Sequence, residues 1–593
     1  MSAHGSTLAI LARHRRRKAR RYGSVITLLV ALIMALFGLT LLLGRTFTPP
    51  GEVVRVLMSE DVPGASFTVG QLRLPRAVLS ILAGLSFGLG GAAFQMMLRN
   101  PLASPDIVGI SAGASAAAVF AIVVLSWQGL AVSMFAVVAG LAVALLVYGL
   151  SFRNGVGGTR LILVGIGVAA MLESSIAYIL SIAPEWNLQE AMRWLTGSVN
   201  GARPEQALPL LVALLAFGGL LLSRARDLEA LRLGDDTAAA LGVGVDRTRI
   251  LVMVAAVGMI AFATAATGPI AFVAFLAGPI AARITGNSGP LPVPASEPIS
   301  GWRGDRCARR AVSALPDHPH EPVGSLVMDP HVIVSALSAG YGDVPVLKGI
   351  DLAIPPGKIT AIVGANACGK STLLKTMSRL IAPDHGQVLL DGTSIHRLPS
   401  RELARTLGLL PQSPVAPEGI TVADLVSRGR HPHQGLFSAW SRKDEDALAA
   451  ALAATRTDTL ADRAVDELSG GQRQRVWIAM ALAQEPKILL LDEPTTFLDV
   501  SHQIEVLDLL TDLNQTRGTT IVMVLHELNL AARYADFLVA MVGGRLHATG
   551  RPQDVLTETN VRDIFGLESR IITDPVSGRP IMLPIGRHRT IAG

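Results

Sequence analysis

The segment Gly364–Ser371 has the residue types and the spacing of a loop that binds nucleotide phosphates. It reads Gly-Ala-Asn-Ala-Cys-Gly-Lys-Ser and fits the pattern G-x-x-x-x-G-K-[ST], between a strand-like run and a helix-favouring run. In such a loop, backbone N–H groups and the following helix N-terminus surround the phosphates. Lys370 can reach the β and γ oxygens, and the Ser371 hydroxyl can bind Mg²⁺. The residues expected to contact ATP here are Gly364, Ala365, Asn366, Ala367, Cys368, Gly369, Lys370, Ser371 and Thr372.

Two adjacent carboxylates follow an apolar run further along the chain. The run Ile488-Leu-Leu-Leu-Asp492-Glu493 predicts a buried strand with both acids at its carboxyl end. Asp492 is suited to hold Mg²⁺, directly or through water, and Glu493 to orient or deprotonate the attacking water. Adjacent acids are weak evidence alone, but with the phosphate loop they predict hydrolysis of ATP.

A further run, Leu468-Ser-Gly-Gly-Gln472, lies between the phosphate loop and the two acids. The Ser469 hydroxyl and the N–H groups of Gly470 and Gly471 can cap a helix and bind a γ-phosphate. With Gln472, this run resembles the signature of the ABC ATPases. In that family the phosphate belongs to ATP held by the opposite subunit. Because the chain has one phosphate loop and one such run, we expect a second copy or a related partner chain.

Three other residues gain a role only from this resemblance. Gln412, after Leu407–Leu410, resembles the lid glutamine that senses the metal and faces the coupling helices. His526, after Ile521–Leu525, matches the switch histidine that contacts the γ-phosphate, and Tyr341 matches the aromatic that stacks on adenine. The resemblance thus assigns catalysis to Glu493, His526 and Gln412, and metal binding to Ser371, Gln412 and Asp492.

The phosphate loop departs from the ABC pattern at two alanines. Ala365 and Ala367 stand where Pro and Gly are common. Ala367 matters more, because a glycine there would tolerate a positive φ angle. The residues that the mechanism needs are intact. We therefore expect ATP binding to persist, in a loop that tolerates a positive φ angle less well.

The ATPase half is similar to a narrower group within the ABC family. Three runs, residues 429–435, 492–503 and 574–580, resemble the ATPase subunits of ferric-enterobactin importers, and the resemblance covers about residues 328–588. Nothing in an ATPase touches the cargo, so the cargo is implied by this resemblance alone.

The elements preceding this half are those of a membrane protein. Half of the 593 residues are hydrophobic and 17% are charged, against roughly 25% charged in soluble domains. A basic stretch from Arg13 to Arg21 precedes the first apolar run. The positive-inside rule accounts for this stretch with fewer assumptions than nucleic-acid binding does. No signal-peptidase-like site follows, so we expect a retained span. Eight runs can span a bilayer: about 24–44, 76–98, 107–126, 130–150, 160–182, 206–223, 248–267 and 269–284.

Five short runs in this region are similar to the permeases that import iron–siderophore complexes, haem and cobalamin. They are residues 73–76, 99–106, 109–115, 233–242 and 268–273, in the family's order. The resemblance implies that residues 233–242 form cytoplasmic coupling helices that dock on the ATPase. It also implies that Arg73 and Arg76 meet acidic residues of an external binding protein. Glu173, inside a span, is a functional candidate or a partnered structural carboxylate.

The segment between the two halves resembles neither the permease family nor the ATPase family. Such permeases have about ten spans, and the last two are not found before a run with seven prolines between Pro290 and Pro322. This is either a flexible linker or the remnant of a gene fusion with Met328 as the former ATPase start; we favour the second. Cys307, His318 and His320 do not fit a known metal-ligand spacing.

We therefore expect a polytopic α-helical membrane domain of about eight spans followed by an α/β P-loop ABC ATPase domain. The predicted parts are a basic cytoplasmic tail (1–23), a permease (24–286), a junction (287–327) and the ATPase (328–593). The resemblance implies ATP-driven import of ferric siderophores across the inner membrane, with an external binding lipoprotein. The alternatives are a defective fusion with ATPase activity only, an exporter half, and, least favoured, a soluble ABC ATPase acting on nucleic acid.

Overall fold

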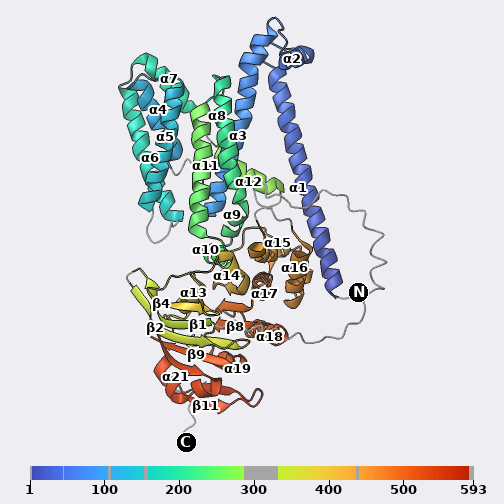
Figure 1. Ribbon diagram of the computed structural model, residues 1–593, viewed down its shortest axis with the longest axis vertical. Helices are drawn as coiled ribbons and strands as arrows, with labels where there is room; N and C mark the ends of the chain where they lie inside the picture. The colour runs from blue at the N-terminus through green and yellow to red at the C-terminus, as the bar shows by residue number, and fades with distance from the viewer. Residues whose placement is uncertain are drawn as a thin grey trace.

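The computed structural model describes residues 3–44, 46–103, 109–151, 158–270, 272–285, 332–342, 344–435 and 440–586. These residues form a bundle of long apolar helices above an α/β part (Figure 1). The predicted junction 287–327, Met328 and the residues Cys307, His318 and His320 lie outside the described residues.

Every apolar run predicted to span the membrane contains a helix. These helices are α1 (Ala3–Leu42), α3 (Leu74–Leu98), α4 (Ile110–Val123), α5 (Leu130–Ser151), α6 (Gly158–Ser181), α8 (Pro204–Ser223), α11 (Val245–Thr267) and α12 (Val273–Thr285). Within the described ranges, six are long and apolar enough to cross a bilayer, while α4 and α12 are shorter. The count of eight spans therefore stays a prediction.

The structure differs from the sequence prediction at the N-terminus. The basic stretch is not a separate tail, because α1 is one continuous helix from Ala3 to Leu42. Arg, Lys, Ala and Leu all favour helix, and the apolar span supplies a long helix from which the turns before it can propagate. Two short helices, α2 (Pro50–Leu57) and α7 (Glu185–Thr196), and a π-helical segment, η1 (Ser66–Arg73), complete the outer connections.

Small residues allow the central helices to approach closely. A Cβ atom on Gly91 of α3 would lie 1.9 Å from the carbonyl oxygen of Ala274 in α12, and one on Gly90 would lie 2.8 Å from Ile260 in α11. Membrane helices pack through such small residues because lipid offers no hydrophobic drive to associate. Helices α3 and α11 thereby form the buried centre of the bundle.

The α/β part contains two main sheets. The order β10-β9-β3-β8-β7-β6 forms a six-stranded sheet, and β2-β1-β4-β5 a four-stranded one. The first comprises β3 (Ile359–Gly364), β6 (Leu407–Leu410), β7 (Ile488–Asp492), β8 (Thr520–Val524), β9 (Phe537–Val542) and β10 (Arg545–Gly550). The second comprises β1 (Val332–Tyr341), β2 (Val344–Ile354), β4 (His385–Leu390) and β5 (Thr393–Ser394). Strands β3, β8, β7 and β6 are parallel, so their carboxyl ends meet at one edge.

Helices cover this sheet, and some of them lie between it and the bundle (Figure 1). They are α13 (Lys370–Met377), α14 (Ser400–Thr406), α15 (Val422–Ser427), η3 (Arg428–His433), α16 (Arg442–Ala454), η4 (Asp458–Leu460), η5 (Val465–Glu467), α17 (Gly470–Leu482), α18 (Val500–Arg517), α19 (Leu528–Tyr534), α20 (Pro552–Val555) and α21 (Glu558–Phe565). A hairpin of β11 (Ser569–Thr573) and β12 (Pro580–Pro584) ends the described chain. Helices α14 to α17 face the bundle, whereas β11 lies at the opposite end (Figure 1).

Candidate functional site

The predicted phosphate loop connects β3 to α13. The Lys370 Nζ donates to the carbonyl oxygens of Gly364 and Ala365 at 2.9 and 3.0 Å, so the buried ammonium lies inside the loop. Ala367 has a φ of 62°, which confirms that a residue other than glycine takes a left-handed conformation here. Such a conformation costs an L-residue about 1–2 kcal/mol. The loop therefore holds its shape against a local strain.

Asp492 lies next to the loop because β7 and β3 flank β8 in the parallel sheet. The Ser371 hydroxyl donates to Asp492 Oδ1 at 2.9 Å. Burial raises the pKa of Asp492; the Ser371 hydrogen bond opposes this, the Glu493 charge adds to it, and the net shift is upward. A hydroxyl and a carboxylate in contact at a strand end are oxygen donors of the kind that Mg²⁺ binds.

Glu493 gathers three side chains from different elements. His526 Nε2 lies 2.5 Å from Oε1, while Gln412 Nε2 and Thr496 Oγ1 donate to Oε2 at 2.7 and 3.0 Å. Burial raises the pKa of Glu493, but the bonds from His526 and Gln412 outweigh it and leave the pKa lowered. Glu493 itself has a φ of 55°. The structure thus brings together Gln412, Glu493 and His526, which are far apart in sequence.

The signature run forms the start of α17. Ser469 and Gln472 form a capping box, with each side chain accepting from the other's backbone N–H. A Cβ atom on Gly471 would lie 2.1 Å from the His502 ring, so a larger residue would require that ring to move. Ser469 and Gly470 are exposed, as a contact with another subunit requires, and Tyr341 at the end of β1 is 54% exposed.

Two short helices of the bundle are seated on the α/β part. They are α9 (Ala225–Leu231) and α10 (Asp235–Ala240). The predicted helix within residues 233–242 is confirmed, and so is its docking: Gln484 donates to the Ala240 carbonyl at 3.1 Å, and Lys375 lies 3.1 Å from Asp236. Helix α10 also packs on β6, the strand that Gln412 follows.

The docking surface extends beyond the predicted run to buried charges on α9. Glu229 pairs with Arg428, and Asp227 Oδ1 lies 3.1 Å from His431 Nε2. The other ring nitrogen of His431 lies 3.1 Å from the Leu241 carbonyl oxygen. Burial raises the pKa of Asp227, but the contacts with His431 and Arg224 outweigh it, and the net pKa is lowered. These paired charges join α9 to the segment α15–η3.

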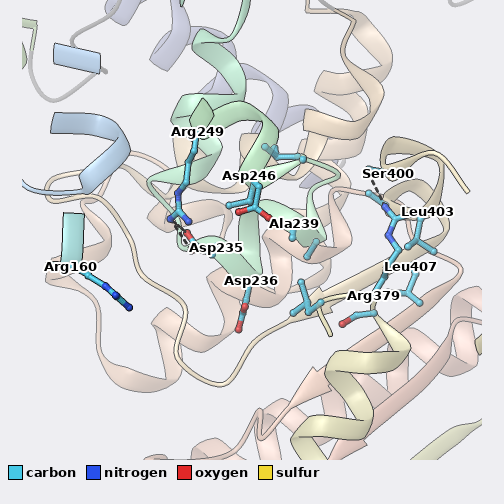
Figure 2. Close-up of a pocket in the computed structure, with 17 residues that line it drawn as sticks. Arg160, Asp235, Asp236, Ala239, Asp246, Arg249, Arg379, Ser400, Leu403 and Leu407 are labelled. Carbon is cyan, nitrogen blue, oxygen red and sulfur yellow. Dashed lines mark hydrogen bonds and ion pairs between the residues drawn. The ribbon is translucent and has the colours of Figure 1, made fainter. Parts of the chain in front are cut away.

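A cavity of about 660 Å³ lies beside this docking surface. Figure 2 shows Asp235, Asp236 and Ala239 of α10 on one side and Arg379, Ser400, Leu403 and Leu407 of the ATPase part on the other. On the bundle side, Asp235 is held by Arg249 at 2.8 Å. The cavity therefore leaves one flank of α10 without packed side chains against the ATPase surface.

Sequence reasoning missed the residues that make this joint. Asp227, Glu229 and Arg428 belong to no motif that was given a role. His431 lies within the run 429–435, which carried the resemblance but received no function. The available signal was the presence of Asp227 and Glu229 in the connection between α8 and α11, together with an ATPase segment rich in Arg and His at residues 428–433.

The expectation that Arg73 meets an external protein is wrong. Its side chain is buried and donates to the carbonyls of Leu41, Leu42 and Thr46 and to the Thr48 hydroxyl. The carbonyls at a helix C-terminus lack intrahelical partners, and Arg73 satisfies them at the end of α1. Arg76 is partly buried on α3, and Glu173 is exposed on α6; their predicted roles stay predictions.

Comparison with known proteins agrees with these two parts. Residues 31–302 match the FecCD transport family, and residues 347–496 match the ABC transporter family. The ferric enterobactin transport ATP-binding protein of Escherichia coli K12 is 53% identical over 251 residues, 42% of this chain and 93% of that protein. The achromobactin transport ATP-binding protein of Dickeya dadantii is 52% identical over 253 residues, and the petrobactin import ATP-binding protein of Bacillus anthracis 51% over 255. Each of these two matches covers 43% of this chain, and 94% and 93% of those proteins respectively.

This chain belongs to the ABC transporter family, with a FecCD-type permease and an ABC ATPase in one polypeptide. It is a multi-pass membrane protein with a cytoplasmic ATPase part. That part binds ATP and hydrolyses it in support of transport.

Proposed function

We propose that this chain imports ferric siderophores across the inner membrane at the expense of ATP. The observation that carries the proposal is the seating of α9 and α10, from a FecCD-type bundle, on an ATPase whose site residues are assembled. The cargo class follows from relatives named for ferric enterobactin, achromobactin and petrobactin. The inner membrane follows from the orientation that the basic N-terminus and a cytoplasmic ATPase require.

The chemistry is assigned to the residues around the phosphate loop. Lys370 and the loop N–H groups hold the phosphates, and Tyr341 stacks on the adenine. Glu493, fixed by Gln412 and His526, orients the attacking water and accepts its proton. The lowered pKa of Glu493 keeps its carboxylate charged at neutral pH, as a base requires.

The donor set beside the loop fits Mg²⁺. The Ser371 hydroxyl and the Asp492 carboxylate are in contact, and Gln412 supplies a further oxygen after β6. Mg²⁺ bound there would neutralise charge on the β and γ phosphates. Asp492 holds its position through Ser371, so the ligand geometry is preset by the strand and the loop.

Two partners complete the proposed importer. The exposed signature residues Ser469 and Gly470 contact ATP held by a second copy or a related chain, so ATP closes a head-to-tail ATPase dimer. An external lipoprotein delivers the cargo. Closure of the dimer moves α9 and α10, and through them the bundle helices that surround the pathway.

The experiment is uptake of labelled ferric enterobactin into cells or proteoliposomes that contain the full chain and a siderophore-binding protein. A matched variant, Ala239→Pro, breaks α10 at a cost of about 3 kcal/mol and leaves the ATPase part unchanged. We expect ATP-dependent uptake by the unmutated chain and a fall in uptake, with persisting ATP hydrolysis, for the variant. Hydrolysis without uptake by the unmutated chain would instead identify a fusion with ATPase activity only, and outward movement would identify an exporter.

A further inference from the structure

Helix α1 continues beyond its apolar part and lies against the ATPase. Figure 1 shows its N-terminal end beside α16, far from the other end of the same helix at α2. Leu11 is only 1% exposed and belongs to the same buried cluster as residues of α15, α16 and α17. A basic segment that served membrane topology alone would need no such burial.

The contacts of this segment are matched pairs of opposite charge. Arg15 lies 2.7 Å from Glu445 of α16 and 4.0 Å from the centre of the Trp440 ring. Lys18 lies 2.8 Å from Asp424 of α15, and His14 lies 2.5 Å from Asp462. Closer to the N-terminus, the Thr7 hydroxyl lies 3.5 Å from Asp458 of η4. The partners come from three separate elements of the ATPase.

The two faces of this part of α1 differ in their exposure to solvent. Leu11, His14, Arg15, Lys18 and Tyr22 follow helical spacing and are all buried or half-buried, whereas Arg13, Arg16, Arg17 and Arg20 follow the same spacing on the opposite, exposed face. Basic residues are thus present on both faces, but among the residues that the structure describes, acidic partners from the ATPase meet only the first. The docked face is therefore selected by charge complementarity rather than by total charge.

This docked face and the coupling helices contact two consecutive elements of the ATPase, α15 and η3. Asp424 in α15 pairs with Lys18 of α1, and Arg428, one turn later, pairs with Glu229 of α9. A small pocket is lined jointly by Lys18, Glu229, Asp424 and Arg428. The chain passes from α15 through α16 to α17, which begins at the signature run. Any movement of this helical region on ATP binding must therefore act on α1 as well as on α9.

We propose that residues 7–22 of α1, the N-terminal strap, are a second coupling element that links the helical region of the ATPase preceding the signature run directly to the first membrane span. The strap rests on the proposed function, because it transmits the ATP-driven movement used for import. It differs from α9 and α10 in that it engages α15, α16 and η4 rather than the surface around η3 and β6. Its partner is the ATPase part of its own chain.

Docking is tested without any cargo by disulfide cross-linking. Thr7→Cys with Asp458→Cys, in a chain carrying Cys307→Ser, places two thiols where the native side chains touch. We expect oxidation in membranes to give an intrachain disulfide, seen as a shifted monomer band. Adding Arg15→Glu should lower its rate about three- to tenfold, because like charges then face each other, and adding Glu445→Arg should restore it. A cross-linked dimer, or no cross-link in the unmutated background, overturns the intrachain strap.

Coupling is tested with labelled ferric enterobactin as the probe. Arg15→Glu should lower uptake about threefold or more while basal ATP hydrolysis is retained. The double variant Arg15→Glu with Glu445→Arg should recover uptake. Arg16→Glu, an equal charge change on the exposed face, should leave uptake unchanged. Equal effects of Arg15→Glu and Arg16→Glu would overturn the coupling role. Absent uptake by the unmutated chain would overturn the proposed function instead, while the cross-link still decides whether the strap docks.

Discussion

The nucleotide site and the joint between the two halves are both made of charged and polar side chains, yet they are built in opposite ways. In the nucleotide site, Ser371, Asp492, Glu493 and His526 are placed by the loops at the carboxyl ends of three strands in one parallel sheet. In the joint, the partners of each pair belong to different parts of the chain, such as Glu229 and Arg428. Chemistry on a substrate constrains residue type and spacing, whereas docking constrains only complementarity. The nucleotide site was therefore recognisable from motifs, whereas the charge pairs of α9 with η3 belong to no motif that was given a role.

The largest expected effect is on ATP hydrolysis in the nucleotide site. Glu493→Gln should lower the rate of ATP hydrolysis by about 10²–10⁴-fold, because the general base is lost while the groups that hold the phosphates remain. Steady-state turnover and ATP affinity are measured together on the purified full chain. Glu505→Gln on α18, an exposed position, is the matched control. Appreciable turnover by Glu493→Gln would remove Glu493 from its proposed role.

A change at Lys370 of the phosphate loop separates ATP binding from turnover in the same nucleotide site. Lys370→Ala should weaken ATP binding by about 10- to 100-fold, the loss expected when hydrogen bonds to charged groups are removed. Equilibrium binding of labelled ATP measures this directly. Lys358→Ala, an exposed lysine just before β3, should bind ATP normally. Equal affinities for the two variants would contradict the position of Lys370 at the phosphates.

The joint is tested by exchanging the charges of one pair, in which Glu229 is buried and Arg428 is half-buried. Glu229→Lys alone or Arg428→Glu alone leaves like charges facing each other and should weaken the joint by about 3–5 kcal/mol. Uptake of the labelled siderophore should fall while ATP hydrolysis continues, since neither residue touches the nucleotide site. The double exchange should recover part of the uptake. A joint that tolerates both single changes would mean that α9 is not a coupling element.

The smallest expected effect concerns strain in the phosphate loop. Ala367→Gly should stabilise the ATPase part by about 1 kcal/mol, because glycine adopts the φ of 62° without the penalty that alanine bears. The thermal unfolding of the ATPase part in the absence of nucleotide measures it. Ala365→Gly, at a position without a positive φ, should give no gain. A larger gain at Ala365 than at Ala367 would contradict the strain.

Most of the ATPase could be predicted because its strands and loops are encoded locally. The apolar runs before Gly364 and Asp492 form β3 and β7, and Ala367, where the sequence pattern has glycine in other ABC proteins, has a positive φ. The role of Arg73 was wrong, because the sequence does not show that the end of α1 leaves carbonyls in need of a donor. The basic stretch was interpreted only as a topology signal, since its acidic partners lie more than 400 residues away.

The sequence by itself determined which segments form apolar membrane helices and which form an α/β domain. It also determined the chemistry of the nucleotide site. Hydropathy over about 20 residues decides whether a segment can lie in lipid, and phosphate binding needs a fixed backbone pattern that few residue types supply. Only the tertiary structure decided which charges meet across the two halves. The facing of Lys18 with Asp424, and of Glu229 with Arg428, depends on the direction in which two helices leave the bundle and on the surface they reach. No local preference of a single segment contains that information.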